Sequence, residues 1–196
     1  MNIGHVAVIA AALVSTSASA STLFSQGIFK NDNDKATVSF TLAKTSNVDL
    51  VSLGFAGGTS ATGRTIAAGG FDSILSLYDA VGNLIVDNDD GANANVDATT
   101  GRAADAELMR TLAAGTYTVY LTQWSNFGPL QLANGFAFDG VPDFRSGFVD
   151  ISGAQRTGAW AFDIRGAAFV PEAGSTAMLL AGLGLLGVVA RRRRAA

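Results

Sequence analysis

Four aspartates in the middle of the chain have the type and spacing to bind a divalent cation. Asp87, Asp89 and Asp90 lie close together, and Asp79 precedes Asp87 by eight positions, across a glycine-asparagine turn. Calcium prefers hard oxygen ligands, so these four carboxylates are a candidate calcium site. The stretch is not an EF-hand, because its glycine comes one position early, at Gly91, and Ala98 stands where that loop has a bidentate glutamate. The alternative is an Asp/Asn-rich turn whose side chains bond the local backbone, and both alternatives also apply to residues 31–34.

A second group of residues combines an aromatic ring with amides just after an apolar, strand-like segment. Gln123, Trp124 and Asn126 have the side chains that sugar-binding surfaces use for stacking and hydrogen bonding. They are a candidate binding surface for a polymer. The alternative is that Trp124 packs in the core or at its rim, as large aromatic side chains commonly do.

The residue types exclude nucleophilic catalysis that depends on histidine or cysteine over most of the chain. Cysteine is absent, and the single histidine is His5, close to the N-terminus. A body without histidine or cysteine cannot assemble a Ser-His-Asp triad, a Cys-His pair or a histidine zinc site. A pair of carboxylates could still hydrolyse a glycoside, with Asp72, Asp143 and Asp163 as candidates, but their spacing singles out no pair. We therefore expect a protein that is not an enzyme.

The segments that must position these residues read as short β-strands. Apolar residues alternate with polar ones in runs bounded by Gly, Asp and Asn, and no segment of the body has a helical stripe. Half-buried sheets need a second sheet to cover their apolar faces, so we expect an all-β, antiparallel, jelly-roll-like β-sandwich. The strands are expected at residues 37–42, 48–55, 71–78, 83–87, 108–112, 115–122, 136–138 and 147–151, with a last strand whose inward face is Trp160, Phe162 and Ile164.

The body also resembles a known accessory domain. Residues 71–91 contain Leu-Ser-Leu-Tyr-Asp, a Gly-Asn turn and the acidic loop, and Ala-Gly-Thr-Tyr-Thr-Val follows at residues 114–119. This order is similar to that of the bacterial pre-peptidase C-terminal (PPC) domain, and residues 33–42 resemble its opening strand. The resemblance implies a PPC-like β-sandwich module over residues 21–169, without catalytic residues.

The N-terminal 20 residues are expected to form a signal peptide. Residues 3–14 are almost entirely apolar, and small residues at 17–20 form a cleavage region of the Ala-x-Ala type. A buried N-terminal helix is the alternative. A signal peptide directs the chain to the Sec export machinery.

The C-terminus has the pattern of a membrane span with a basic stop signal. Residues 173–190 carry no charge, and as a helix these about 18 residues would cover about 27 Å, near the thickness of a bilayer core. Arg191, Arg192, Arg193 and Arg194 follow, which favours a cytoplasmic C-terminus. The alternative, a nucleic-acid patch, conflicts with the composition of the body, where 14 Asp and Glu107 dominate. We expect no nucleic-acid partner.

These last residues resemble the PEP-CTERM sorting signal, which consists of a Val-Pro-Glu-Pro element, an apolar helix and a basic cluster. The matching residues are Val170, Pro171, Glu172 and the arginine run, whereas Ala173 replaces the second proline. The resemblance implies export, temporary anchoring in the inner membrane through the C-terminal helix, and cleavage near Pro-Glu by an exosortase. The alternative is a permanent single-span anchor.

Together these observations predict a non-catalytic protein of the cell envelope or extracellular matrix. Its β-sandwich would bind a surface polymer such as an exopolysaccharide, or an envelope protein, with calcium as the possible cofactor. The alternatives are a small glycan-active enzyme that uses carboxylates and a permanently anchored structural module.

Overall fold

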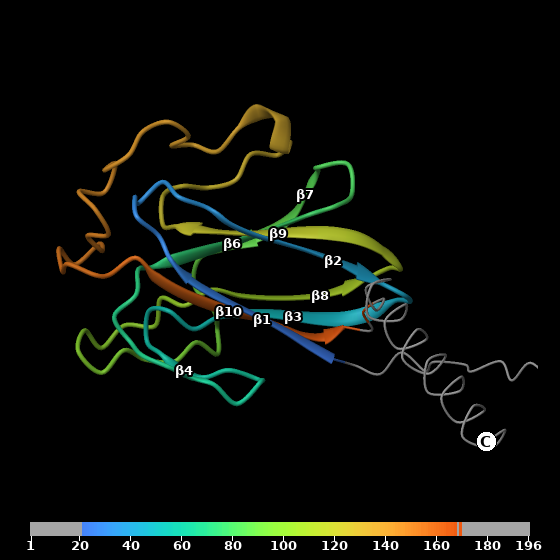
Figure 1. The fold of residues 1–196 in the computed structure, drawn as a ribbon, viewed down its shortest axis with the longest axis horizontal. Coiled ribbons are helices and arrows are strands. Elements are labelled where there is room, and N and C mark those ends of the chain that lie inside the picture. The colour runs from blue at the N-terminus through green and yellow to red at the C-terminus, as the bar shows by residue number, and fades with distance from the viewer. Residues whose placement is uncertain (1–20, 168, 170–196) are drawn as a thin grey trace, which may run out of the picture.

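The computed structural model describes residues 21–167 and residue 169, and this part of the chain forms two antiparallel sheets stacked face to face (Figure 1). The strand order of the first sheet is β1 (Ser21–Ile28), β10 (Ala159–Ala167), β3 (Ser46–Ser52) and β8 (Glu107–Leu112). The order of the second is β2 (Ala36–Leu42), β9 (Gly115–Gln123), β6 (Ser73–Tyr78) and β7 (Leu84–Asn88). A small hairpin, β4 (Gly58–Thr59) and β5 (Thr65–Ile66), and a 3-10 helix, η1 (Leu132–Asn134), complete the described elements.

Alternation of side chains explains why these segments form half-buried strands. In β9, Tyr117, Val119 and Leu121 are buried and belong to the core. Residues between them point away from the core, where the Thr118 hydroxyl bonds the hydroxyl of Ser39 on β2 at 2.9 Å. The alternation predicted for residues 115–122 is therefore confirmed.

The core lies between the two sheets and receives side chains from both. Every one of the eight long strands except β1 contributes a buried apolar side chain, or one packed against the buried cluster. The buried members are Phe29, Ala36, Phe40, Leu42, Val48, Leu50, Phe71, Leu75, Leu77, Ala106, Leu108, Leu112, Tyr117, Val119, Leu121, Phe148, Phe162 and Ile164. The expected all-β, antiparallel sandwich is confirmed for the described residues.

The outer face of the second sheet is covered by the long connection between β9 and β10. Tyr120 of β9 packs its ring against Phe136, and the Tyr78 hydroxyl donates to the carbonyl of Pro129 at 3.0 Å. All six residues of β6 are consequently buried. The strands predicted at residues 136–138 and 147–151 are wrong, because these segments form turns, with a single bridge from Val149 to Gln155.

The β4–β5 hairpin lies against the outer face of the first sheet. The Ala61 amide donates to Asp163 Oδ2 at 2.7 Å, and the Arg64 guanidinium carbon lies 5.3 Å from the centre of the Phe24 ring. Neither this hairpin nor β1 was predicted from the sequence. The β9–β10 connection thus covers the outer face of the second sheet, and the β4–β5 hairpin covers part of the outer face of the first sheet.

The predicted signal peptide at residues 1–20 and the predicted transmembrane helix at 173–190 lie outside the described residues. Within residues 21–167 and 169, we find no helix that is long and apolar enough to cross a membrane.

Candidate functional site

The β6–β7 hairpin separates the four aspartates of the predicted calcium site. In its register Tyr78 pairs with Leu84, whereas Asp87 pairs with Ser76. Asp79 therefore lies at the turn, and Asp89 and Asp90 follow β7 at the opposite end of the hairpin. The structure does not bring these four carboxylates together, and among the described residues no group of three or more His, Cys, Asp or Glu could hold a metal ion.

Asp79 instead organises the turn beside it. Its Oδ1 accepts hydrogen bonds from the amides of Val81 and Asn83, and its Oδ2 accepts one from the Asn83 side chain at 2.7 Å. The bonds from Asn83 lower the pKa of Asp79 from its usual value. Asp34 has a similar role near β2, because its Oδ2 accepts the amides of Lys30 and Asn31.

Asp89 and Asp90 lie near another aspartate, Asp72, at the start of β6. Burial raises the pKa of Asp72 to about 7, and the charge of Asp90 adds to this effect. Arg102 opposes it, with Nη2 placed 3.8 Å from Asp72 Oδ2. Asp150 also contributes to raising the pKa of Asp72. This end of the sandwich therefore concentrates negative charge around one buried carboxyl.

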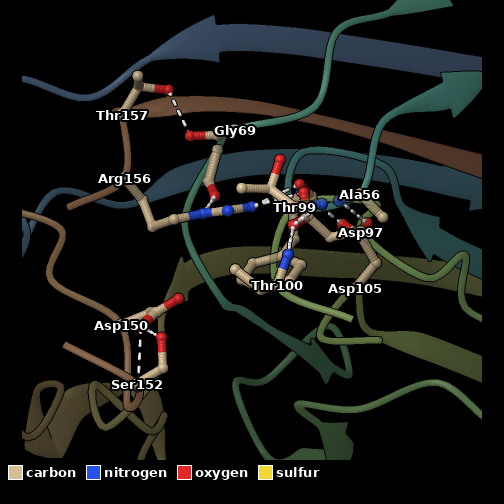
Figure 2. A network of polar contacts seen from close by, with 12 residues as sticks. Ala56, Gly69, Asp97, Thr99, Thr100, Asp105, Asp150, Ser152, Arg156 and Thr157 are labelled. Carbon is tan, nitrogen blue, oxygen red and sulfur yellow. Dashed lines mark hydrogen bonds and ion pairs between the residues drawn. The ribbon is translucent and has the colours of Figure 1, made fainter. Parts of the chain in front are cut away.

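The same end of the molecule contains a buried polar network centred on Arg156 (Figure 2). Arg156 Nε donates to the Gly70 carbonyl at 2.9 Å, and Nη2 donates to the Phe55 carbonyl at 2.6 Å. Nη2 also lies 3.4 Å from Asp97 Oδ2, and the guanidinium stacks over the Phe55 ring. Asp105, in turn, accepts the amides of Phe55 and Ala56. Most of these partners are backbone groups of neighbouring loops, so the network fixes loop conformation.

The amide and aromatic side chains proposed as a binding surface are mostly buried. Gln123 is 2% exposed and Asn126 is 0% exposed. Asn126 supports the covering loop, because its carbonyl accepts the Thr122 hydroxyl and its Oδ1 accepts the Phe138 amide. Trp124 is half-buried, and the Arg145 guanidinium carbon lies 4.7 Å from the centre of its ring. The structure does not present these three residues as one open surface.

The three carboxylates considered for glycoside hydrolysis occupy different parts of the fold. Asp72 precedes β6 of the second sheet, Asp163 is buried on β10 of the first sheet, and Asp143 is exposed in the covering connection. Among the described residues, no cleft places any two of these carboxylates opposite each other.

An open polar surface does occur on the outer face of the first sheet. We call it the polar face and define it as Asn47, Asp49, Glu107, Met109, Thr111 and Arg165, which belong to β3, β8 and β10. Their neighbours along the strands, such as Val48, Leu50 and Ile164, are in the core, so these side chains point away from it. One recess of about 310 Å³ is lined by residues of β3 and β8, among them Asp49 and Met109. A second, of about 210 Å³, is lined by Glu107, Arg165 and the loop residues Asn93 and Asn95.

Sequence reasoning missed this surface. Apart from Met109, its residues are polar positions on the outward side of β3, β8 and β10. The same pattern is typical of a strand face that contacts only solvent. Neither the antiparallel pairing of Asp49 with Met109 on one side nor its pairing with Arg165 on the other could be read from the pattern.

Comparison with known proteins finds a known motif in the C-terminal segment of the chain. No curated protein matches the chain. Residues 169–194 match the family model of the PEP-CTERM protein-sorting motif, and this range contains Val170, Pro171, Glu172 and the four arginines of the predicted signal. Phe169, its first residue, forms a bridge with Leu42 at the end of β2. The resemblance of the body to the PPC domain stays a prediction, because the match lies outside it. The motif indicates an exported protein that is anchored in the membrane and sorted by an exosortase.

Proposed function

We propose that this protein is a non-catalytic binding module, which the sorting motif delivers to the cell envelope or beyond and which there binds a surface polymer. The observation that carries the proposal is the match of residues 169–194, which follows β10 almost directly. Because the motif is joined almost directly to the last strand of the sandwich, the domain that it sorts is the sandwich. The absence of cysteine from the sequence, and of histidine beyond His5, supports a role in binding over one in nucleophilic catalysis.

Export and binding are tested by separate measurements. For sorting, the intact mass of the protein is measured in envelope and medium fractions of the native host. We expect a mass that corresponds to loss of both the N-terminal 20 residues and the C-terminal arginines. A protein that keeps the arginines at steady state would instead be a permanent anchor.

For binding, the protein is sedimented with purified exopolysaccharide of the native host. We expect it in the pellet with the polymer and in the supernatant without it. If it stays in the supernatant in both cases, the sandwich does not bind this polymer, and the part of the proposal that concerns binding is contradicted while the part that concerns sorting is not.

A further inference from the structure

The polar face has the features of a binding site, beginning with its shape. Its two recesses adjoin, because the first is lined by Asp49 on β3, whose neighbour Arg165 on β10 lines the second. Both recesses open on the same side of one sheet. A surface of this form accommodates an extended ligand lying across the strands, such as a polymer chain.

Unsatisfied polar atoms at the centre of the polar face indicate the chemistry of that ligand. Asp49 Oδ1 and Arg165 Nε are both shielded from solvent, and neither has a hydrogen-bond partner among the described residues. Asp163 Oδ1 is also shielded and has no hydrogen-bond partner among the described residues. The Asp163 side chain is 0% exposed, and its Oδ2 accepts a hydrogen bond from Arg165 Nη2 at 3.1 Å. A buried polar atom without a partner is unfavourable, and the side chains of Arg165 and Asp49 are still 34% and 29% exposed, so a ligand that reaches them and supplies partners gains affinity.

The unsatisfied atoms, a carboxylate oxygen and a guanidinium nitrogen, belong to side chains that lie side by side. Arg165 Nη1 is 3.7 Å from Asp49 Oδ2, so the two side chains form one site. The carboxylate needs a donor, whereas the guanidinium needs an acceptor. A phosphate or carboxylate would satisfy only Arg165, and an amine would satisfy only Asp49. A hydroxyl both donates and accepts, and therefore suits both.

The charge of the polar face and its exposed methionine narrow the class of ligand further. Asp49, Asp163 and Glu107 surround the Arg165 guanidinium, and Arg110, which lines the first recess, is the second positive charge, so carboxylates outnumber guanidiniums and the face disfavours an acidic polymer. Met109, paired with Asp49 in the sheet, is 65% exposed and offers apolar surface beside the polar groups. A sugar ring presents both hydroxyls and C–H groups.

We infer that the polar face binds neutral sugar units of a polysaccharide chain, with Asp49 and Arg165 bonding hydroxyls and Met109 contacting the ring. The inference rests on the proposed polymer-binding function and specifies its site and ligand class.

Methionine methyl labelling tests the inference on the whole chain. The sequence has three methionines, and Met109 is the only one between residues 21 and 169. The full-length protein, in a zwitterionic detergent without sugar groups, is labelled at its methionine methyls, and the Met109 resonance is assigned with the Met109→Leu variant. Neutral and acidic fractions of the host exopolysaccharide are then titrated separately. We expect the Met109 resonance to shift with the neutral fraction and not with the acidic one.

A matched pair of substitutions tests the role of the carboxylate. Asp49→Asn replaces a charged acceptor with a weaker neutral one and should weaken binding of the neutral fraction about tenfold. Asp143→Asn makes the same change on an exposed loop with a φ of 62°, which asparagine tolerates, and should bind like the unchanged protein.

The outcomes separate this inference from the proposed function. Binding of the neutral fraction without a Met109 shift, or with normal affinity in Asp49→Asn, overturns the inference and leaves polymer binding intact. Preference for the acidic fraction also overturns it. Binding of neither fraction contradicts the proposed polymer binding itself, and the inference with it. Should Asp49→Asn fail to fold, the methyl titration of the unchanged protein decides alone.

Discussion

Asp72 allows a quantitative prediction about stability and pH. The residue is 6% exposed, and burial together with the nearby charge of Asp90 raises its pKa from 3.8 to about 7. The folded protein therefore holds the Asp72 proton more tightly than the unfolded chain does. Well below pH 3.8 both states are protonated and the Asp72 charge costs the fold nothing. As the pH rises to about 7, ionisation increasingly favours the unfolded state, and the loss is complete above that pH.

The magnitude follows from the difference between the two pKa values. Going from 3.8 to about 7 is a change of about 3, and each pKa unit corresponds to about 1.4 kcal/mol, so the ionised carboxyl costs at most about 4 kcal/mol. Asp72→Asn removes this charge while keeping the shape of the side chain. We expect its free energy of unfolding to exceed that of the unchanged protein by up to about 4 kcal/mol at pH 8, and to be similar at pH 4.

The assay is urea unfolding of both proteins at pH 4 and pH 8. Asp79→Asn is the matched control, because hydrogen bonds from Asn83 lower the pKa of Asp79. Its carboxylate stabilises the fold above the unfolded pKa and loses this effect as the pH falls through the lower folded value. Asp79→Asn should therefore be less stable than the unchanged protein at pH 8. If Asp72→Asn is instead less stable than the unchanged protein at pH 8, the charge of Asp72 is compensated in the fold and carries no penalty.

Three further predictions concern metal, the polar network and backbone packing. Calcium or a chelator should leave the melting temperature unchanged, because the β6–β7 register separates Asp79 from Asp90; a calcium-dependent rise in differential scanning fluorimetry would contradict this. Arg156→Lys should lower the free energy of unfolding by about 3 kcal/mol, measured in urea, because lysine cannot reproduce the fork that bonds two carbonyls and Asp97; unchanged stability would show that the network contributes little. Gly70→Ala should lower the melting temperature strongly, because its Cβ would lie 2.3 Å from the carbonyl oxygen of Ala159; a melt like that of the unchanged protein would show that the backbone adapts.

The strands that the sequence predicts well are those whose apolar residues face one sheet-sheet core. In β9 the apolar residues at alternate positions, Tyr117, Val119 and Leu121, are buried in the core, and in β10 Trp160, Phe162 and Ile164 pack on the same core. Strand prediction from apolar residues is wrong between β9 and β10. Phe136 is apolar there because its ring covers the outer face of the second sheet, and its segment forms no strand. A short apolar run has the same composition whether it pairs as a strand or packs as a loop.

The predicted sites depended on proximity that only strand register determines. Asp79 and Asp87 are near in sequence, but antiparallel pairing places Asp87 opposite Ser76 and carries the chain away from the turn. The polar face shows the converse, because Asp49 and Arg165 are distant in sequence and become neighbours through pairing of β3 with β10. The sorting motif needed no such pairing information, since it is a linear pattern, and it was recognised from the sequence.

Protease accessibility shows whether the sandwich is delivered across the inner membrane. A protease site is inserted at Gly63, in the turn of the β4–β5 hairpin, where an added Cβ would meet no atom within 4 Å. The protease is then added outside spheroplasts with an intact inner membrane, and to the culture medium. The account predicts cleavage at Gly63 in one of these two fractions before any detergent is added. Cleavage only after the inner membrane is dissolved would place the sandwich in the cytoplasm and contradict the account.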